Sequence, residues 1–240
     1  MADLGTSEPT TRRNFLRLVG ASAAGTVMTE YSTDVAAALT KATDGTKDVV
    51  WLQGQTCSAC TMSTLQGASP SLEEAISEFK LNVTYHPEIM AETGQDAIDA
   101  MSDAPDILMI EGAIPTKIPS AATFGRDEKG RLKPIVDWVK ELAPRSEFVM
   151  GIGTCACYGG WQSAQNGAPA VTDDAEQGPW LDDNVTGAKG VQFTHQQGDE
   201  GVLGPDFRSN AGLPVINVPG CMTHPDYVLL TVATLLNGHT

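Results

Sequence analysis

Hydrophobic positions along the chain fall into short segments of two kinds. Continuous or alternating apolar runs, typical of buried strands, occur at 48–52, 81–85, 106–110, 148–150 and 214–218. Apolar residues at helical spacing predict helices at 70–79, 94–101, 132–142 and 226–236. Strands that alternate with helices at such short spacing favour a parallel sheet with helices on both faces. The pattern therefore predicts an α/β fold.

One segment, residues 161–213, departs from this alternation. It is rich in Gly, Asp, Gln and Asn and shows little periodicity. We expect a long irregular insertion between two strands of the sheet, of the kind that is usually functional or forms an interface.

The first forty residues have the parts of an export signal. Arg12 and Arg13 precede a weakly apolar run at 18–28, and the small residues 36–38 offer a cleavage site. The arginine pair followed by Phe-Leu resembles a twin-arginine leader. The alternative is a frayed N-terminal helix. We predict a signal peptide at 1–40, a single domain at 41–240, and a location in the periplasm or on the outer face of the cytoplasmic membrane.

Composition narrows the classes of partner. The chain has 240 residues, 41% of them hydrophobic, which suffices for one core. Its 30 acidic and 15 basic residues give a net charge of -15, which repels nucleic acid and anionic lipid. No run reaches the ~20 apolar residues that cross a bilayer. We expect no nucleic-acid partner and no membrane span in the mature chain.

Four of the five cysteines follow predicted strands. Cys57 and Cys60 come after the first strand, Cys155 after the fourth and Cys221 after the fifth. Ligands of open α/β sheets bind at the carboxyl ends of the strands, so these three loops are expected to meet. Four converging thiolates suit a metal centre, either an iron–sulfur cluster or zinc.

Glycines surround these cysteines. Gly153, Gly159, Gly160 and Gly220 let the backbone approach closely and direct N–H groups towards sulfur. A lone C-x-x-C motif would be ambiguous, because thioredoxin-like redox pairs, zinc sites and clusters all use it. Three cysteine loops that each close a strand favour the metal centre.

Five segments, in the same order, resemble the small subunits of nickel–iron hydrogenases. They are 51–60 (WLQGQTCSAC), 86–94 (HPEIMAETG), 111–115 (EGAIP), 153–160 (GTCACYGG) and 219–226 (PGCMTHPD). The resemblance implies a flavodoxin-like domain that relays electrons from the nickel–iron site of a large subunit to an acceptor. It also implies a heterodimer in which the large subunit splits hydrogen, so the chain alone is not catalytic.

The resemblance also implies the ligands of one 4Fe–4S cluster. By motif these are Cys57, Cys60, Cys155 and Cys221. No cysteine follows Cys221, so the clusters of a second domain, which many small subunits carry, lack their usual ligands here. We therefore expect a further electron-carrying subunit that docks near the C-terminal helix or the insertion.

Other residues near the motifs either depart from the family pattern or are candidates for a role at the site. Thr56 and Met62 stand where the family usually has acids, which weakens a proton route through the first loop. Cys157 is expected to be an ordinary buried thiol. Glu111 is interpreted as a structural acceptor for loop N–H groups, with proton handling as the alternative. His224 either donates a hydrogen bond near the cluster or packs in its turn.

The sequence leaves three other functions open. A subunit of a related quinone reductase would share the cluster domain, although that family usually places two adjacent cysteines in its first loop. An exported thiol–disulfide oxidoreductase would use Cys57 and Cys60 but leaves Cys155 and Cys221 unexplained. A zinc-binding structural protein would use all four thiols.

Overall fold

The computed structural model describes residues 46–68, 71–163, 185–194 and 199–236. The predicted signal peptide at 1–40 lies outside the described residues, as does much of the predicted insertion. Among the described helices, none has the length and apolar character needed to cross a membrane.

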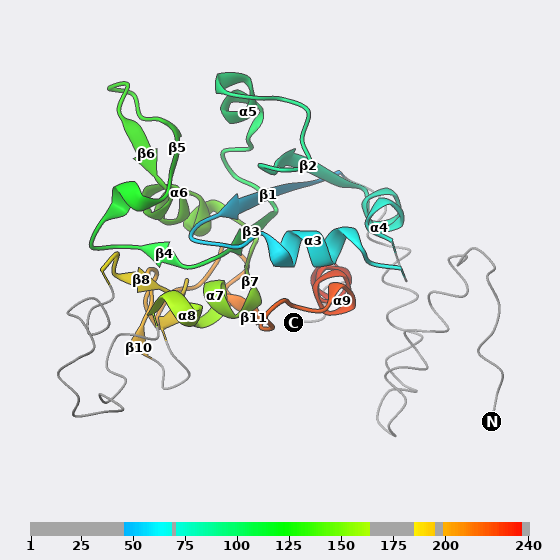
Figure 1. The fold of residues 1–240 in the computed structure, drawn as a ribbon. Coiled ribbons are helices and arrows are strands. Elements are labelled where there is room, and N and C mark those ends of the chain that lie inside the picture. The colour runs from blue at the N-terminus through cyan, green and yellow to red at the C-terminus, as the bar shows by residue number, and fades with distance from the viewer. Residues whose placement is uncertain (1–45, 69–70, 164–184, 195–198, 237–240) are drawn as a thin grey trace.

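Five strands form one parallel sheet at the centre of the domain (Figure 1). Their order across the sheet is β2-β1-β3-β7-β11. The strands are β1 (Lys47–Gln53), β2 (Leu81–Tyr85), β3 (Ile107–Glu111), β7 (Phe148–Ile152) and β11 (Ile216–Val218). This is the strand order of flavodoxin-like folds. The predicted fold class and all five predicted strands are confirmed.

Helices cover both faces of this sheet (Figure 1). One face packs against α3 (Ala59–Leu65), α4 (Leu72–Glu78) and α9 (Pro225–Leu236). The other face packs against α5 (Gln95–Ala100) and α6 (Ile135–Leu142).

The strands supply both cores by alternation. In β1, Val49 and Trp51 belong to the first core, and Val50 and Leu52 to the second. The central strand β3 is buried along its whole length. A strand that is buried on both faces needs the continuous apolar run that marked it in the sequence.

The predicted helix at 132–142 is wrong in its first turn. Leu132–Pro134 form strand β6, which pairs in an antiparallel hairpin with β5 (Thr123–Arg126). Helix α6 begins only at Ile135, with Pro134 in extended conformation as its N-cap. The cause is Pro134, because a proline disfavours the helical conformation of the residue before it. Leu132, which had suggested the earlier start, is 58% exposed.

Residues 161–163 of the predicted insertion belong to helix α8 (Gly160–Ser163), whereas its other described parts, 185–194 and 199–213, contain only two-residue strands. β8 (Ala188–Lys189) pairs with β4 (Ile114–Pro115), and β9 (Phe193–Thr194) pairs with β10 (Asp199–Glu200). Buried Gln192 fastens this region to the domain. Its amide Nε2 donates to two backbone carbonyls, and its Oε1 accepts from the N–H of Val215. These parts are irregular, as predicted.

Candidate functional site

The predicted cysteine loops do lie past the carboxyl ends of their strands. Cys57 follows β1, and Cys60 lies in the first turn of α3. Cys155 lies in helix α7 (Gly153–Tyr158), which starts directly where β7 ends. Cys221 follows β11. Because β1, β7 and β11 run parallel, all three loops emerge at the same edge of the sheet.

Backbone hydrogen bonds join these loops. The N–H of Thr154 donates to the carbonyl of Gly220 over 2.9 Å, and the N–H of Gly220 donates to Thr154 Oγ1 over 3.2 Å. Ser63 Oγ in α3 donates to the carbonyl of Thr223 over 2.8 Å. The segments that carry Cys60, Cys155 and Cys221 are therefore tied to one another.

Two glycines make room for the thiols. Gly153 has φ +81°, and a Cβ built there would lie 2.4 Å from Cys60 Sγ. Gly160 has φ +58°, and its Cβ would lie 2.5 Å from Cys155 Sγ. Any larger residue would combine an unfavourable backbone conformation with a collision against sulfur. The close approach expected of these two glycines is confirmed.

The thiols share one electrostatic environment. Burial raises the pKa of Cys60 to about 11, and the charges of Glu111, Cys155 and Cys57 add to this effect. Burial also raises the pKa of Cys155, with contributions from Cys221 and Cys57. In the metal-free protein, the thiolates of Cys60 and Cys155 are thus disfavoured by burial and by neighbouring negative charges. A bound cationic metal centre would reverse that balance, because it stabilises thiolates.

Sequence reasoning missed two residues that donate to the sulfurs. The backbone N–H of Thr223 bonds to Cys60 and lowers its pKa, and the side chain of Gln162 does the same for Cys155. Gln162 lies in α8 (Gly160–Ser163), and its Nε2 also donates to the carbonyl of Gln55 over 2.8 Å. No sequence pattern signals these contacts, because the first depends on how two separate loops meet and the second on how α8 turns back towards α7.

The remaining candidates have structural contacts. Cys157 is fully buried, its thiol donates to the carbonyl of Gly151 over 3.3 Å, and burial raises its pKa to about 12. Glu111 accepts from the backbone N–H groups of Cys60 and Thr61, as the structural interpretation predicted. Exposed His224 accepts through Nδ1 from the N–H of Asp226, which is a local contact of its own turn.

Four cysteine thiolates are the usual ligands of an iron–sulfur cluster, and they also suit a structural zinc ion. Among the described residues, no three His, Cys, Asp or Glu side chains are grouped for a single metal ion. Cys60 is buried and Cys155 is partly exposed, and the backbone of Gly153 and Gly160 lies directly against their sulfurs.

The fold and the cysteine edge define a flavodoxin-like domain with a candidate metal centre at the carboxyl ends of its strands. Within that class, the chain belongs to the family described as NADH ubiquinone oxidoreductase, 20 Kd subunit, which matches residues 57–235. The matched range contains all five cysteines.

Curated relatives of the chain are named as hydrogenase small subunits. The F420 non-reducing hydrogenase I small subunit of Methanosarcina mazei is 29% identical over 95% of this chain and 57% of its own length. The periplasmic [NiFeSe] hydrogenase small subunit of Desulfomicrobium baculatum is 30% identical over 92% of this chain and 64% of its own length. The predicted resemblance is confirmed, and the chain spans about three fifths of the length of these relatives.

Solved structures of hydrogenases also resemble this chain. The recombinant [NiFeSe] hydrogenase of Desulfovibrio vulgaris Hildenborough matches with a TM-score of 0.60 and 28% identity, over 82% of this chain and 61% of that chain. The actinobacterial-type NiFe-hydrogenase of Ralstonia eutropha H16 matches with a TM-score of 0.61 and 27% identity, over 81% of this chain and 55% of that chain.

Proposed function

We propose that the chain is the electron-transferring subunit of a nickel–iron hydrogenase and holds one 4Fe–4S cluster on Cys57, Cys60, Cys155 and Cys221. The observation that carries this proposal is the meeting of three cysteine loops at one sheet edge, in a chain whose relatives are hydrogenase small subunits. When bound, such a cluster takes up and releases electrons singly. The chain itself contributes no catalytic side chain to hydrogen splitting.

The protein's own part is to hold and tune the cluster. The backbone at Gly153 and Gly160 leaves space for the sulfurs of Cys60 and Cys155. Donation from Thr223 and Gln162 favours the thiolate form of those two ligands. Hydrogen bonds to ligand sulfur are a principal means by which a protein sets a cluster's reduction potential.

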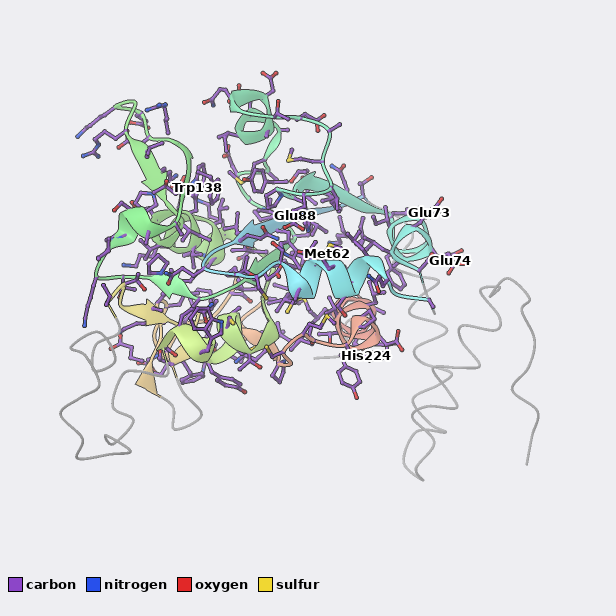
Figure 2. All side chains as sticks on the ribbon, viewed as in Figure 1. Met62, Glu73, Glu74, Glu88, Trp138 and His224 are labelled. Carbon is purple, nitrogen blue, oxygen red and sulfur yellow. The ribbon has the colours of Figure 1, made fainter. Side chains whose placement is uncertain are left out.

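The partner in this proposal is a large subunit that carries the nickel–iron site. Large apolar side chains are exposed beside the ligand loops: Met62 on α3 (Figure 2), Trp161 on α8, and Met222 next to Cys221. Exposed apolar groups of this size, near a redox centre that must be kept from water, mark an interface. We expect an obligate contact that buries more than ~2,000 Å² in total.

A further electron-carrying subunit would collect electrons from the single cluster. Helix α9 offers a mostly apolar groove, in which Tyr227 is 62% exposed. The groove is lined by Ile216, Tyr227, Leu230, Thr231, Thr234 and Leu235. This groove supports the C-terminal helix as the docking position. Removing the groove's apolar character, by Leu230→Glu, is expected to slow electron transfer to the carrier while hydrogen-dependent dye reduction persists.

Export is the third part of the proposal. Relatives named as periplasmic support it, and the arginine pair Arg12–Arg13 would be the address read by the twin-arginine pathway. Changing both arginines to lysine is expected to retain the assembled protein in the cytoplasm. Unaltered export of the double variant would refute the twin-arginine assignment.

The ligand assignment is tested by single Cys→Ser variants of the anaerobically purified heterodimer. Loss of any of the four proposed ligands is expected to lower bound iron and abolish hydrogen-dependent dye reduction. Cys157→Ser is the matched control, because Cys157 lies in the same helix as Cys155 and should keep its iron. Iron loss in the Cys157 variant but not in the Cys155 variant would overturn the assignment. Zinc in place of iron would favour the structural-protein alternative.

A second candidate function follows from the description of the matching family, which is a quinone-reductase subunit. The two functions differ in the partner. A copurifying large subunit that contains nickel, with hydrogen-dependent activity of the complex, supports the hydrogenase. A nickel-free complex that reduces quinone without using hydrogen supports the alternative.

A further inference from the structure

A buried carboxylate lies directly behind the first cysteine loop. Glu111 is the last residue of β3 and is 1% exposed. Its Oε1 accepts from Thr56 Oγ1 (3.0 Å), Cys60 N (3.2 Å) and Thr61 N (3.4 Å), and its Oε2 accepts from Trp51 Nε1 (3.1 Å), Gln53 Nε2 (3.2 Å) and Thr61 Oγ1 (2.5 Å).

The N–H partners of this carboxylate are all hydrogen-bond donors. The indole N–H of Trp51, the amide of Gln53 and two backbone N–H groups can only donate to it. Convergent N–H donors stabilise a carboxylate even where water is excluded. Among the described residues, no lysine or arginine forms an ion pair with Glu111. A net negative charge therefore remains behind the loop.

The same contacts cap helix α3 from outside its own sequence. Its N-cap residue, Ser58, has a left-handed backbone (φ 59°) and makes no side-chain cap, and the first turn contains no acid. The free N–H groups at a helix start need acceptors, and anions are favoured there. Glu111, from a strand about fifty residues later, supplies that acceptor at Cys60 and Thr61.

The carboxylate also shapes the turn before the helix. Thr56 Oγ1 donates to Glu111 and accepts from the N–H of Ser58 over 3.0 Å. The turn that presents Cys57 and the helix start that presents Cys60 are thus held through one group. The N–H groups of Cys60 and Thr61 point at Glu111, so this carboxylate occupies donors that could otherwise face sulfur.

We propose that Glu111 is a positioning residue for the cluster: its carboxylate fixes the loop 56–61 and places a negative charge behind Cys60 that lowers the cluster's reduction potential. Reduction adds negative charge to the cluster, and a neighbouring anion opposes this. The inference rests on the proposed cluster function.

The test compares Glu111→Gln with Glu88→Gln in the cluster-loaded heterodimer. Both glutamates accept from Gln53 Nε2, but Glu88 is exposed (Figure 2). Redox titration followed by electron paramagnetic resonance gives the midpoint potential. We expect an upward shift and an altered spectrum of the reduced cluster in Glu111→Gln, and wild-type values in Glu88→Gln. Identical potentials and spectra in the two variants would overturn the inference.

A second variant covers the case in which Glu111→Gln yields no loaded protein. Glu111→Asp keeps the charge and shortens the reach, so the loaded complex should retain a potential near wild type. Its amides at 60–61 should exchange hydrogen roughly tenfold faster. Wild-type exchange at these amides would overturn the positioning role. If the wild-type protein itself binds no iron, the proposed function fails, and that outcome is distinct from a failure at Glu111.

Discussion

Replacing Gly153 by alanine is expected to remove Cys60 from its place in the site. Gly153 starts α7 with φ +81°, and the added Cβ would lie 2.4 Å from Cys60 Sγ and 3.5 Å from the carbonyl of Gly220. Non-bonded heavy atoms such as carbon prefer separations of about 3.5–4.0 Å. The sulfur must therefore retreat by about 1 Å, or the start of α7 must move.

The energetic cost has two parts. A left-handed backbone costs a residue with a Cβ about 1–2 kcal/mol relative to glycine. Overpacking against a buried neighbour costs about 1–3 kcal/mol more. Together these reach about 2–5 kcal/mol, a large share of the 5–15 kcal/mol that stabilises a typical domain. The displacement of the sulfur has a separate effect under the proposed function, because a cluster ligand about 1 Å out of place would bind iron poorly.

Gly212→Ala is the matched control. Gly212 has φ +79°, nearly the same as Gly153, but nothing lies within 4 Å of an added Cβ. The Gly212→Ala variant should lose only the backbone contribution to the free energy of unfolding, about 1–2 kcal/mol in urea unfolding, and should keep its iron. Gly153→Ala should lose more stability and most of its iron. Equal stability and equal iron in the two variants would refute the close approach of the Gly153 backbone to Cys60.

Three further expectations concern the rest of the domain. Burial lowers the pKa of His86 from 6.5, so the unfolded state takes up a proton at this residue first, and the stability of the fold should decrease as the pH drops below 6.5. Melting temperatures measured at pH 5.5 and 7.5 check this. The difference between the two temperatures should be smaller in His86→Gln than in the wild type. In the native metal-free protein, iodoacetamide should modify exposed Cys57 and leave Cys157 unmodified, which mass spectrometry of digests would show. Equal labelling of the two cysteines would contradict the burial of Cys157. Ser71→Ala removes the capping box that Ser71 forms with Glu74 and should cost about 1 kcal/mol in urea unfolding, whereas no change would show that the cap is dispensable.

The sequence by itself determined the sheet and the position of the cysteines along it. Strands β1, β3 and β7 are buried on both faces, so each needs a continuous apolar run, which is visible without a structure. Once those strands are parallel, the loops after them must share an edge. The convergence of Cys57, Cys155 and Cys221 therefore follows from topology that the pattern already contains.

Only the tertiary structure decided the local form of the ligand loops. Helices α3 and α7 were not predicted, since each is short and α3 carries no capping side chain of its own. Helix α3 has an acceptor only because Glu111 reaches it from another strand. Thr223, the donor to the sulfur of Cys60, likewise comes from another loop. Such contacts join residues far apart in the chain, and no local periodicity or propensity encodes which of them will meet.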